Sequence, residues 1–142
     1  MTKPLAKAEK RIDAAVDRWR DRLWLKQWDA TIRFSEGKVR GSAADIAAAM
    51  DAVPRYKTML MTVNSEWLEK ASPRAIEDVT CHEIVHAVLS PLKDVAEAML
   101  KALPKADRKG FDNWLQKENE AVTTHLEHIF RREARWPKRS LK

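Results

Sequence analysis

The chain has 142 residues, of which 44% are hydrophobic, enough for one domain with a core and too few for two ordinary domains. Its formal charge is +6, and its single cysteine excludes an internal disulfide. No apolar run reaches the length of a membrane span, and the first residues lack the apolar segment of a signal peptide. We therefore expect one cytoplasmic domain over residues 1–142, with no membrane contact.

The first half of the chain changes from helical to strand periodicity. Apolar residues recur every three or four positions from Lys3 to about Leu25, which predicts an amphipathic helix. Apolar and polar residues then alternate from Trp28 to Phe34, as in a half-buried strand. The stretch 43–53 has alanines that favour helix and an alternation that favours strand. We favour strand, because a turn at 53–56 and a second alternating run at 59–63 would complete a hairpin.

The second half is mainly helical. Ser72 and Pro73 mark a helix start, and Pro91 marks its end. We expect a short helix or loop at 64–71, the central helix at about 73–90, a further helix or ordered excursion at 92–103, a polar loop at 104–110 and a long helix at about 111–135. The predicted fold class is α+β, with an N-terminal helix, a short and mostly antiparallel sheet, a central helix and a long C-terminal helix.

The central helix contains the sequence His-Glu-Ile-Val-His at positions 82–86. Two histidines four positions apart project from one face of a helix, so both imidazoles can reach a single ion. Glu83 is rotated to the side, where its carboxylate can act on a metal-activated water without displacing the ligands. The alternative is a pair of core histidines bonded to backbone carbonyls, but burying two imidazoles and a carboxylate without a metal would be costly. The neighbouring Cys81 points about 100° away and is predicted to pack in the core.

A catalytic zinc site needs a third protein ligand from elsewhere in the sequence. The metzincin arrangement is excluded, because Leu89 and Leu92 occupy the places of its glycine and third histidine. The last helix offers Glu118 and Glu120, and a helical wheel places Glu118 nearer to the apolar stripe.

Three further polar residues are candidates for supporting roles. His125 and His128 are considered as alternative ligands or as hydrogen-bond donors to the oxyanion of a hydrolytic reaction. Tyr56 is a third candidate donor. Each also has an ordinary structural interpretation, as a polar residue beside a core helix or as a packed turn residue.

The run Asn-Glu-Ala-Val-Thr at positions 119–123 resembles the gluzincins. In these thermolysin-like zinc peptidases, a downstream helix supplies a glutamate within an Asn-Glu-Ala-hydrophobic-Ser-Asp run. The resemblance implies that His82, His86 and Glu120 bind Zn²⁺ and that Glu83 is the general base, and it favours Glu120 over Glu118. It also extends to small single-domain members encoded by bacteriophages and prophages.

One position departs from that family pattern. Gluzincins have an aspartate four residues past the ligand glutamate, which orients the first histidine. Here that position is Thr124, so the residues that support the ligands must differ.

These features predict a zinc peptidase that hydrolyses peptide bonds of a peptide or protein substrate, bound in extended form along the edge of the hairpin. Basic residues at both ends, including a tail at 131–142, also suggest nucleic-acid contact and a DNA-associated protease similar to the SprT-like proteases. Those enzymes take a third histidine closer downstream, and no histidine lies between His86 and His125. A non-catalytic module with a metal-stabilised fold is the remaining alternative.

Overall fold

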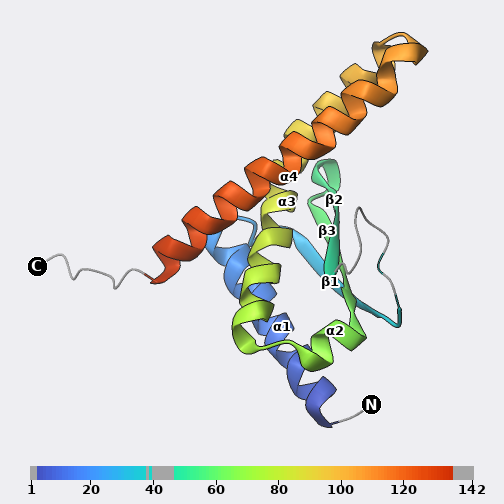
Figure 1. Cartoon of the computed structure of the whole chain (residues 1–142). Helices are drawn as coiled ribbons and strands as arrows, with labels where there is room; N and C mark the ends of the chain where they lie inside the picture. The colour runs from blue at the N-terminus through green and yellow to red at the C-terminus, as the bar shows by residue number, and fades with distance from the viewer. Residues whose placement is uncertain (1–2, 38, 40–46, 136–142) are drawn as a thin grey trace, which may run out of the picture.

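The computed structural model describes residues 3–37, 39 and 47–135, and these form an α+β arrangement (Figure 1). Its elements, in chain order, are α1 (Lys3–Arg22), β1 (Asp29–Ser35), β2 (Ala48–Val53), the 3-10 turn η1 (Pro54–Tyr56), β3 (Thr58–Asn64), α2 (Ser65–Lys70), α3 (Pro73–Ala102) and α4 (Lys105–Arg135). Helix α3 packs against α1, α4 and β2, so it is the central element. None of the described helices is both long and apolar enough to cross a bilayer.

Helix α1 has the amphipathic character that the sequence predicts. It ends at Arg22, three residues before the predicted end at about Leu25. Trp24 adopts a left-handed conformation with φ 63°, which stops the helix. The amide of Leu25 then donates to the carbonyl of Arg20 at 2.8 Å, and the amide of Trp24 donates to the carbonyl of Asp21 at 3.3 Å. These two bonds form the usual C-terminal cap, with tryptophan at the position that glycine normally occupies.

The three-stranded sheet has the order β1-β3-β2. Strands β2 and β3 pair antiparallel through the turn at η1, which confirms the predicted hairpin, and the predicted strand at 43–53 is confirmed over Ala48–Val53. Residues 43–46 lie outside the described part of the chain. The sheet is mixed and not mostly antiparallel, because β1 pairs parallel with β3. Alternation fixes which face of a strand is buried but leaves the direction of its neighbour open.

Two side-chain caps set the helix starts near the centre of the domain. The side-chain oxygen of Asn64 accepts hydrogen bonds from the amides of Glu66 and Trp67, which starts α2 directly after β3. Ser72 caps α3 by accepting from the amide of Ala75 at 3.1 Å, and Pro73 occupies the first turn, as the sequence predicts.

The predicted end of the central helix at Pro91 is wrong. Helix α3 continues through Pro91 to Ala102, so the separate helix expected at 92–103 belongs to α3. Proline lacks the amide that would bond to the carbonyl of Ala87. The hydroxyl of Ser90 donates to that carbonyl at 2.7 Å instead, which replaces the missing hydrogen bond.

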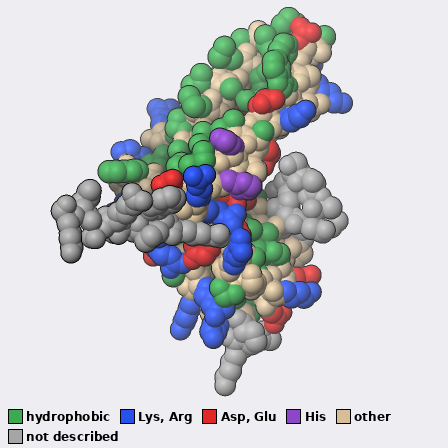
Figure 2. Space-filling view, turned by 60° about the vertical axis from the view of Figure 1, so that its left-hand side comes forward, with side chains coloured by type: hydrophobic (Ala, Val, Ile, Leu, Met, Phe, Trp, Pro, Cys, Tyr) green, Lys and Arg blue, Asp and Glu red, His purple; other side chains and the backbone are tan. Residues whose placement is uncertain are grey.

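The predicted polar loop at 104–110 is also wrong. Only Leu103 and Pro104 separate α3 from α4, and α4 is helical from Lys105 onward. Lysine, alanine and arginine in this stretch are good helix formers, and one exposed glycine, Gly110, costs only about 1 kcal/mol. The two long helices form an antiparallel hairpin that projects beyond the sheet (Figure 1), and hydrophobic side chains lie on its surface (Figure 2).

Candidate metal centre

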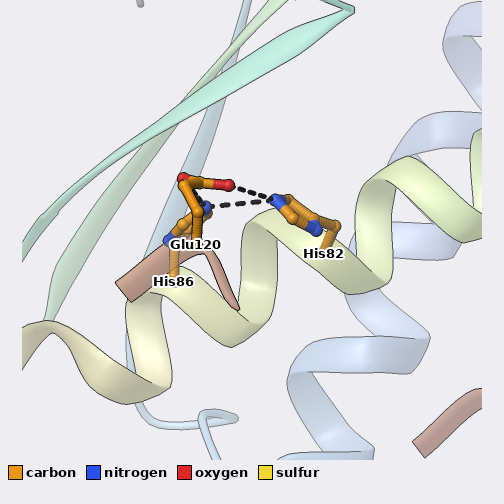
Figure 3. A group of neighbouring side chains, drawn as sticks. All are labelled: His82, His86 and Glu120. Carbon is orange, nitrogen blue, oxygen red and sulfur yellow. Dashed lines mark hydrogen bonds and ion pairs between the residues drawn. The ribbon is translucent and has the colours of Figure 1, made fainter. Parts of the chain in front are cut away.

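Two imidazoles and one carboxylate converge between α3 and α4 (Figure 3). His82 and His86 lie one turn apart on α3, and their Nε2 atoms are 3.2 Å from each other. Glu120 reaches them from α4, with one carboxylate oxygen 3.4 Å from His82 Nε2 and the other 3.1 Å from His86 Nε2. Residues 34 and 38 positions apart in the sequence therefore share one site.

These atoms lie close enough together for one metal ion to reach all three residues. Zinc binds imidazole nitrogen and carboxylate oxygen at about 2.0–2.1 Å, which places neighbouring ligand atoms about 3.3 Å apart in a tetrahedron. The two Nε2 atoms here are 3.2 Å apart, and each faces a different oxygen of Glu120, at 3.4 and 3.1 Å. With one ligand atom taken from each residue, the three atoms lie within 4.8 Å of one another. The donor set of two histidines and one glutamate is also one that catalytic zinc uses, with the fourth position left for water or substrate.

Hydrogen bonds on the far side of each ring present Nε2 to the site. His82 Nδ1 lies 3.0 Å from the carboxylate of Glu127, which can only accept, so Nδ1 carries the proton. Thr123 donates its hydroxyl proton to the carbonyl of Asn119 at 2.7 Å and lies 3.3 Å from His86 Nδ1. The hydroxyl can therefore accept from that nitrogen. The side-chain amide of Asn119, whose nitrogen lies 3.4 Å from the same atom, can accept as well when its oxygen and nitrogen are exchanged. Both Nε2 atoms then point a lone pair toward the same place.

This arrangement concentrates negative potential. Two lone pairs and the Glu120 carboxylate face one another, and they repel each other unless a cation lies between them. Burial lowers the pKa of His86 to about 4, so this ring stays neutral at neutral pH and cannot supply the cation by protonation. The site is therefore suited to a divalent metal ion.

Glu83 is buried beside the ligands, with 7% of its surface exposed. Burial, with a smaller contribution from the nearby Glu120 carboxylate, raises the pKa of Glu83 to about 8, and a hydrogen bond from the Met50 backbone amide opposes the rise. A cation held by His82, His86 and Glu120 would favour the charged form of this carboxylate, which is the form that can accept a proton.

A cleft of about 570 Å³ holds these residues. Strand β2 lies at one edge of the sheet and forms one wall of the cleft, while α3 and α4 form the other. The amide of Asn64 on β3 donates a hydrogen bond to the carbonyl of Ala47 at 2.8 Å. In an antiparallel pair every second residue directs its main-chain N–H and C=O groups at the neighbouring strand, so those of Ala47, Ala49 and Asp51 face β3. The main-chain groups of Ala48, Met50 and Ala52 consequently point toward the open side of the sheet.

The structure separates the two glutamates that the sequence left as alternatives. Glu120 faces the histidines, whereas Glu118 accepts a hydrogen bond from Trp114 Nε1 at 3.2 Å and lines a hollow near the tip of the hairpin. The helical wheel favours Glu118 only if the apolar stripe of α4 faces the site. The face toward the site instead carries Asn119, Glu120, Thr123 and Glu127, and Val122 is exposed.

The candidate oxyanion donors lie apart from the cleft. His125 and His128 are exposed on α4, and neither is among the described residues that line the cleft. Tyr56 is 69% exposed in η1, with the guanidinium of Arg55 over its ring. Thr124 is exposed as well, so it takes no part in orienting a ligand.

Sequence reasoning missed three residues that support the site. Glu127 accepts from His82 and also from Arg131 at 2.7 Å, and Arg131 bonds to Asp78 on α3 at 2.6 Å. Glu127 lies seven residues past Glu120, two helical turns along the same face, and this spacing is the signal that could have found it. Arg131 was expected in a basic tail at 131–142 but belongs to α4 and is ion-paired, while residues 136–142 lie outside the described part.

Replacing Glu127 with alanine is expected to weaken zinc binding about 10- to 100-fold, because His82 loses the acceptor that fixes its ring and tautomer. Competition with a chromophoric chelator would measure the affinity. The control is Glu133→Ala, an exposed glutamate on the same helix. Equal zinc affinities in the two variants would show that Glu127 does not support the metal ligands.

Cys81 is fully buried beside His82, in agreement with the predicted packing role. Burial raises the pKa of its thiol to about 12, so the thiol is neutral and unreactive at neutral pH.

No family model, curated protein or solved structure matches this chain.

Proposed function

We propose that this protein is a zinc-dependent peptidase with a gluzincin-like site in a small zincin-like domain. The observation that carries the proposal is the convergence of His82, His86 and Glu120, whose ligand atoms lie within 4.8 Å of one another. The buried carboxylate of Glu83 beside them supports a hydrolytic role over a purely structural one. In this proposal Glu127 orients the first histidine, which is the task of the aspartate that Thr124 replaces.

Zinc in this site would supply a Lewis acid that lowers the pKa of a water molecule and polarises the substrate carbonyl. Glu83 takes a proton from the attacking water and passes it to the nitrogen of the leaving amine. The charge of the zinc ion would favour the ionised form of Glu83 that accepts the proton, and the burial of this carboxylate would favour its protonated form until the proton passes to the amine. Glu127 and Thr123 hold the two imidazoles in place throughout.

The substrate would be an extended peptide lying along β2. This strand is the edge that faces the site, whereas β3, at residues 58–64, is the central strand. Main-chain carbonyls of Ala48, Met50 and Ala52 are directed to the open side, where a peptide backbone can pair with them. Such main-chain pairing would position the scissile bond beside Glu83 with little dependence on side chains.

The proposal is tested by metal analysis combined with an activity assay. Purified protein is expected to contain about one zinc ion per chain and to cleave an unfolded protein substrate. Chelation should stop cleavage, zinc should restore it, and magnesium should not, because magnesium prefers octahedral oxygen ligands. Zinc-loaded protein that cleaves no unfolded substrate would contradict the peptidase assignment and leave a metal-stabilised binding module.

A further inference from the structure

The α3–α4 hairpin carries a group of exposed apolar side chains, which we call the hairpin face. It consists of Leu92, Val95 and Met99 on α3 with Phe111, Trp114, Val122 and Ile129 on α4, each between 40% and 72% exposed. Seven of the ten large hydrophobic side chains exposed in the described part of the chain belong to it, so apolar exposure is concentrated here. Hydrophobic side chains gather along this hairpin in Figure 2.

The residues of the hairpin face lie on the same side of both helices. Leu92, Val95 and Met99 follow the spacing of three and four residues that forms one stripe on a helix. The α4 residues continue this surface, because an apolar hollow of about 450 Å³ is lined jointly by Met99, Phe111 and Trp114. His86 is about 120° around α3 from Leu92, so the hairpin face points away from the metal centre.

This surface is larger than a monomer ordinarily exposes. At roughly 200 Å² for a fully exposed large side chain, the seven residues leave on the order of 800 Å² uncovered. The largest apolar patch on a typical monomer is about 300–600 Å². Covering the face on two chains would bury about 1,600 Å², the standard size of a stable protein interface.

We propose that the hairpin face binds the same face of a second copy of this chain, so that two hairpins form a four-helix bundle. Two antiparallel helices with their apolar stripes on one side are half of such a bundle, and a two-fold axis joins the same patch on both subunits. The metal centres remain accessible in the dimer, because they lie on the other side of each hairpin. The proposal does not depend on the peptidase function.

The charges on the polar sides of the hairpin favour a protein partner over a membrane surface. Helices that lie on anionic membranes carry mainly lysine and arginine on their polar face. The polar sides of this hairpin carry both signs, with Lys93, Lys101 and Lys117 among Asp94, Glu97, Asp112 and Glu118. Of these, Lys93, Asp94 and Glu97 line the metal cleft. Lys93 and Glu97 already form an ion pair at 3.7 Å. A polar side of mixed sign lacks the uniform positive charge that attracts such helices to an anionic membrane.

Light scattering coupled to gel filtration tests the proposal on the full chain. The wild-type protein is expected to have twice the 16.4 kDa mass of one chain at micromolar concentrations. Met99→Glu and Trp114→Glu should each shift it to the monomer, while the matched control Trp24→Glu, at another exposed tryptophan, should remain dimeric. Circular dichroism and zinc content should be unchanged in all three variants, because the replaced side chains lie at the surface.

Three results would overturn the proposal. The wild-type protein could be monomeric at every concentration measured, or the dimer could persist in both hairpin variants. Alternatively, a monomeric wild-type protein could sediment with vesicles of anionic phospholipid in a manner that Met99→Glu and Trp114→Glu abolish. That last outcome would assign the hairpin face to a membrane surface.

Discussion

Replacing Glu83 with glutamine is expected to lower the turnover number by roughly 10²- to 10⁴-fold while about one zinc ion per chain remains bound. Glutamine keeps the size of the side chain but cannot take a proton from water, and Glu83 contributes no ligand atom to the site. Peptide cleavage and zinc content, measured on the same preparation, check both halves of this expectation. Glu133→Gln, an exposed glutamate on α4, is the matched control.

The two measurements separate the rival accounts of the site. Full activity in Glu83→Gln would exclude Glu83 as the general base. Loss of zinc in the same variant would instead show that this carboxylate binds the metal, which the geometry of His82, His86 and Glu120 does not suggest. A cellular phenotype that survives Glu83→Gln and is lost with the metal would indicate a binding module.

Replacing Glu120 with alanine is expected to weaken zinc binding by more than the roughly 10- to 100-fold loss typical of a residue outside the coordination sphere. Glu120 supplies the only carboxylate oxygens in the described convergence of ligand atoms. Glu118→Ala is the control, because Glu118 bonds to Trp114 and lies away from the histidines.

Zinc affinity of both variants, measured by chelator competition, decides between the two glutamates. Tight binding in Glu120→Ala together with weak binding in Glu118→Ala would reverse the assignment. Equal and unchanged affinities would mean that the third ligand comes from elsewhere.

The central helix was predictable because its signals are local. Ser72 and Pro73 start α3 as expected, and the helical repeat alone places His82 and His86 on one face. The α+β class and the hairpin of β2 with β3 likewise follow from periods of 3.6 and 2.

The two errors in helix ends have different physical causes. Pro91 usually ends a helix, but the Ser90 hydroxyl satisfies the carbonyl that proline leaves free. The polar stretch 104–110 is helical from Lys105 because its lysines, alanine and arginine favour helix and outweigh the cost of one glycine. The Ser90 contact cannot be recognised from periodicity alone.

The supporting residues of the site needed knowledge of how the two long helices pack. Glu127 reaches His82 only because α4 runs antiparallel along α3, and Arg131 meets Asp78 for the same reason. The sequence indicates that these residues share a face of α4 with Glu120, but not that this polar face is the one turned toward α3.

Anomalous diffraction at the zinc edge, from crystals of protein purified without added metal, tests the central claim most directly. The account predicts one peak about 2.0–2.1 Å from His82 Nε2, from His86 Nε2 and from a carboxylate oxygen of Glu120. A zinc peak bound by other residues, or no peak between these three side chains, would contradict it.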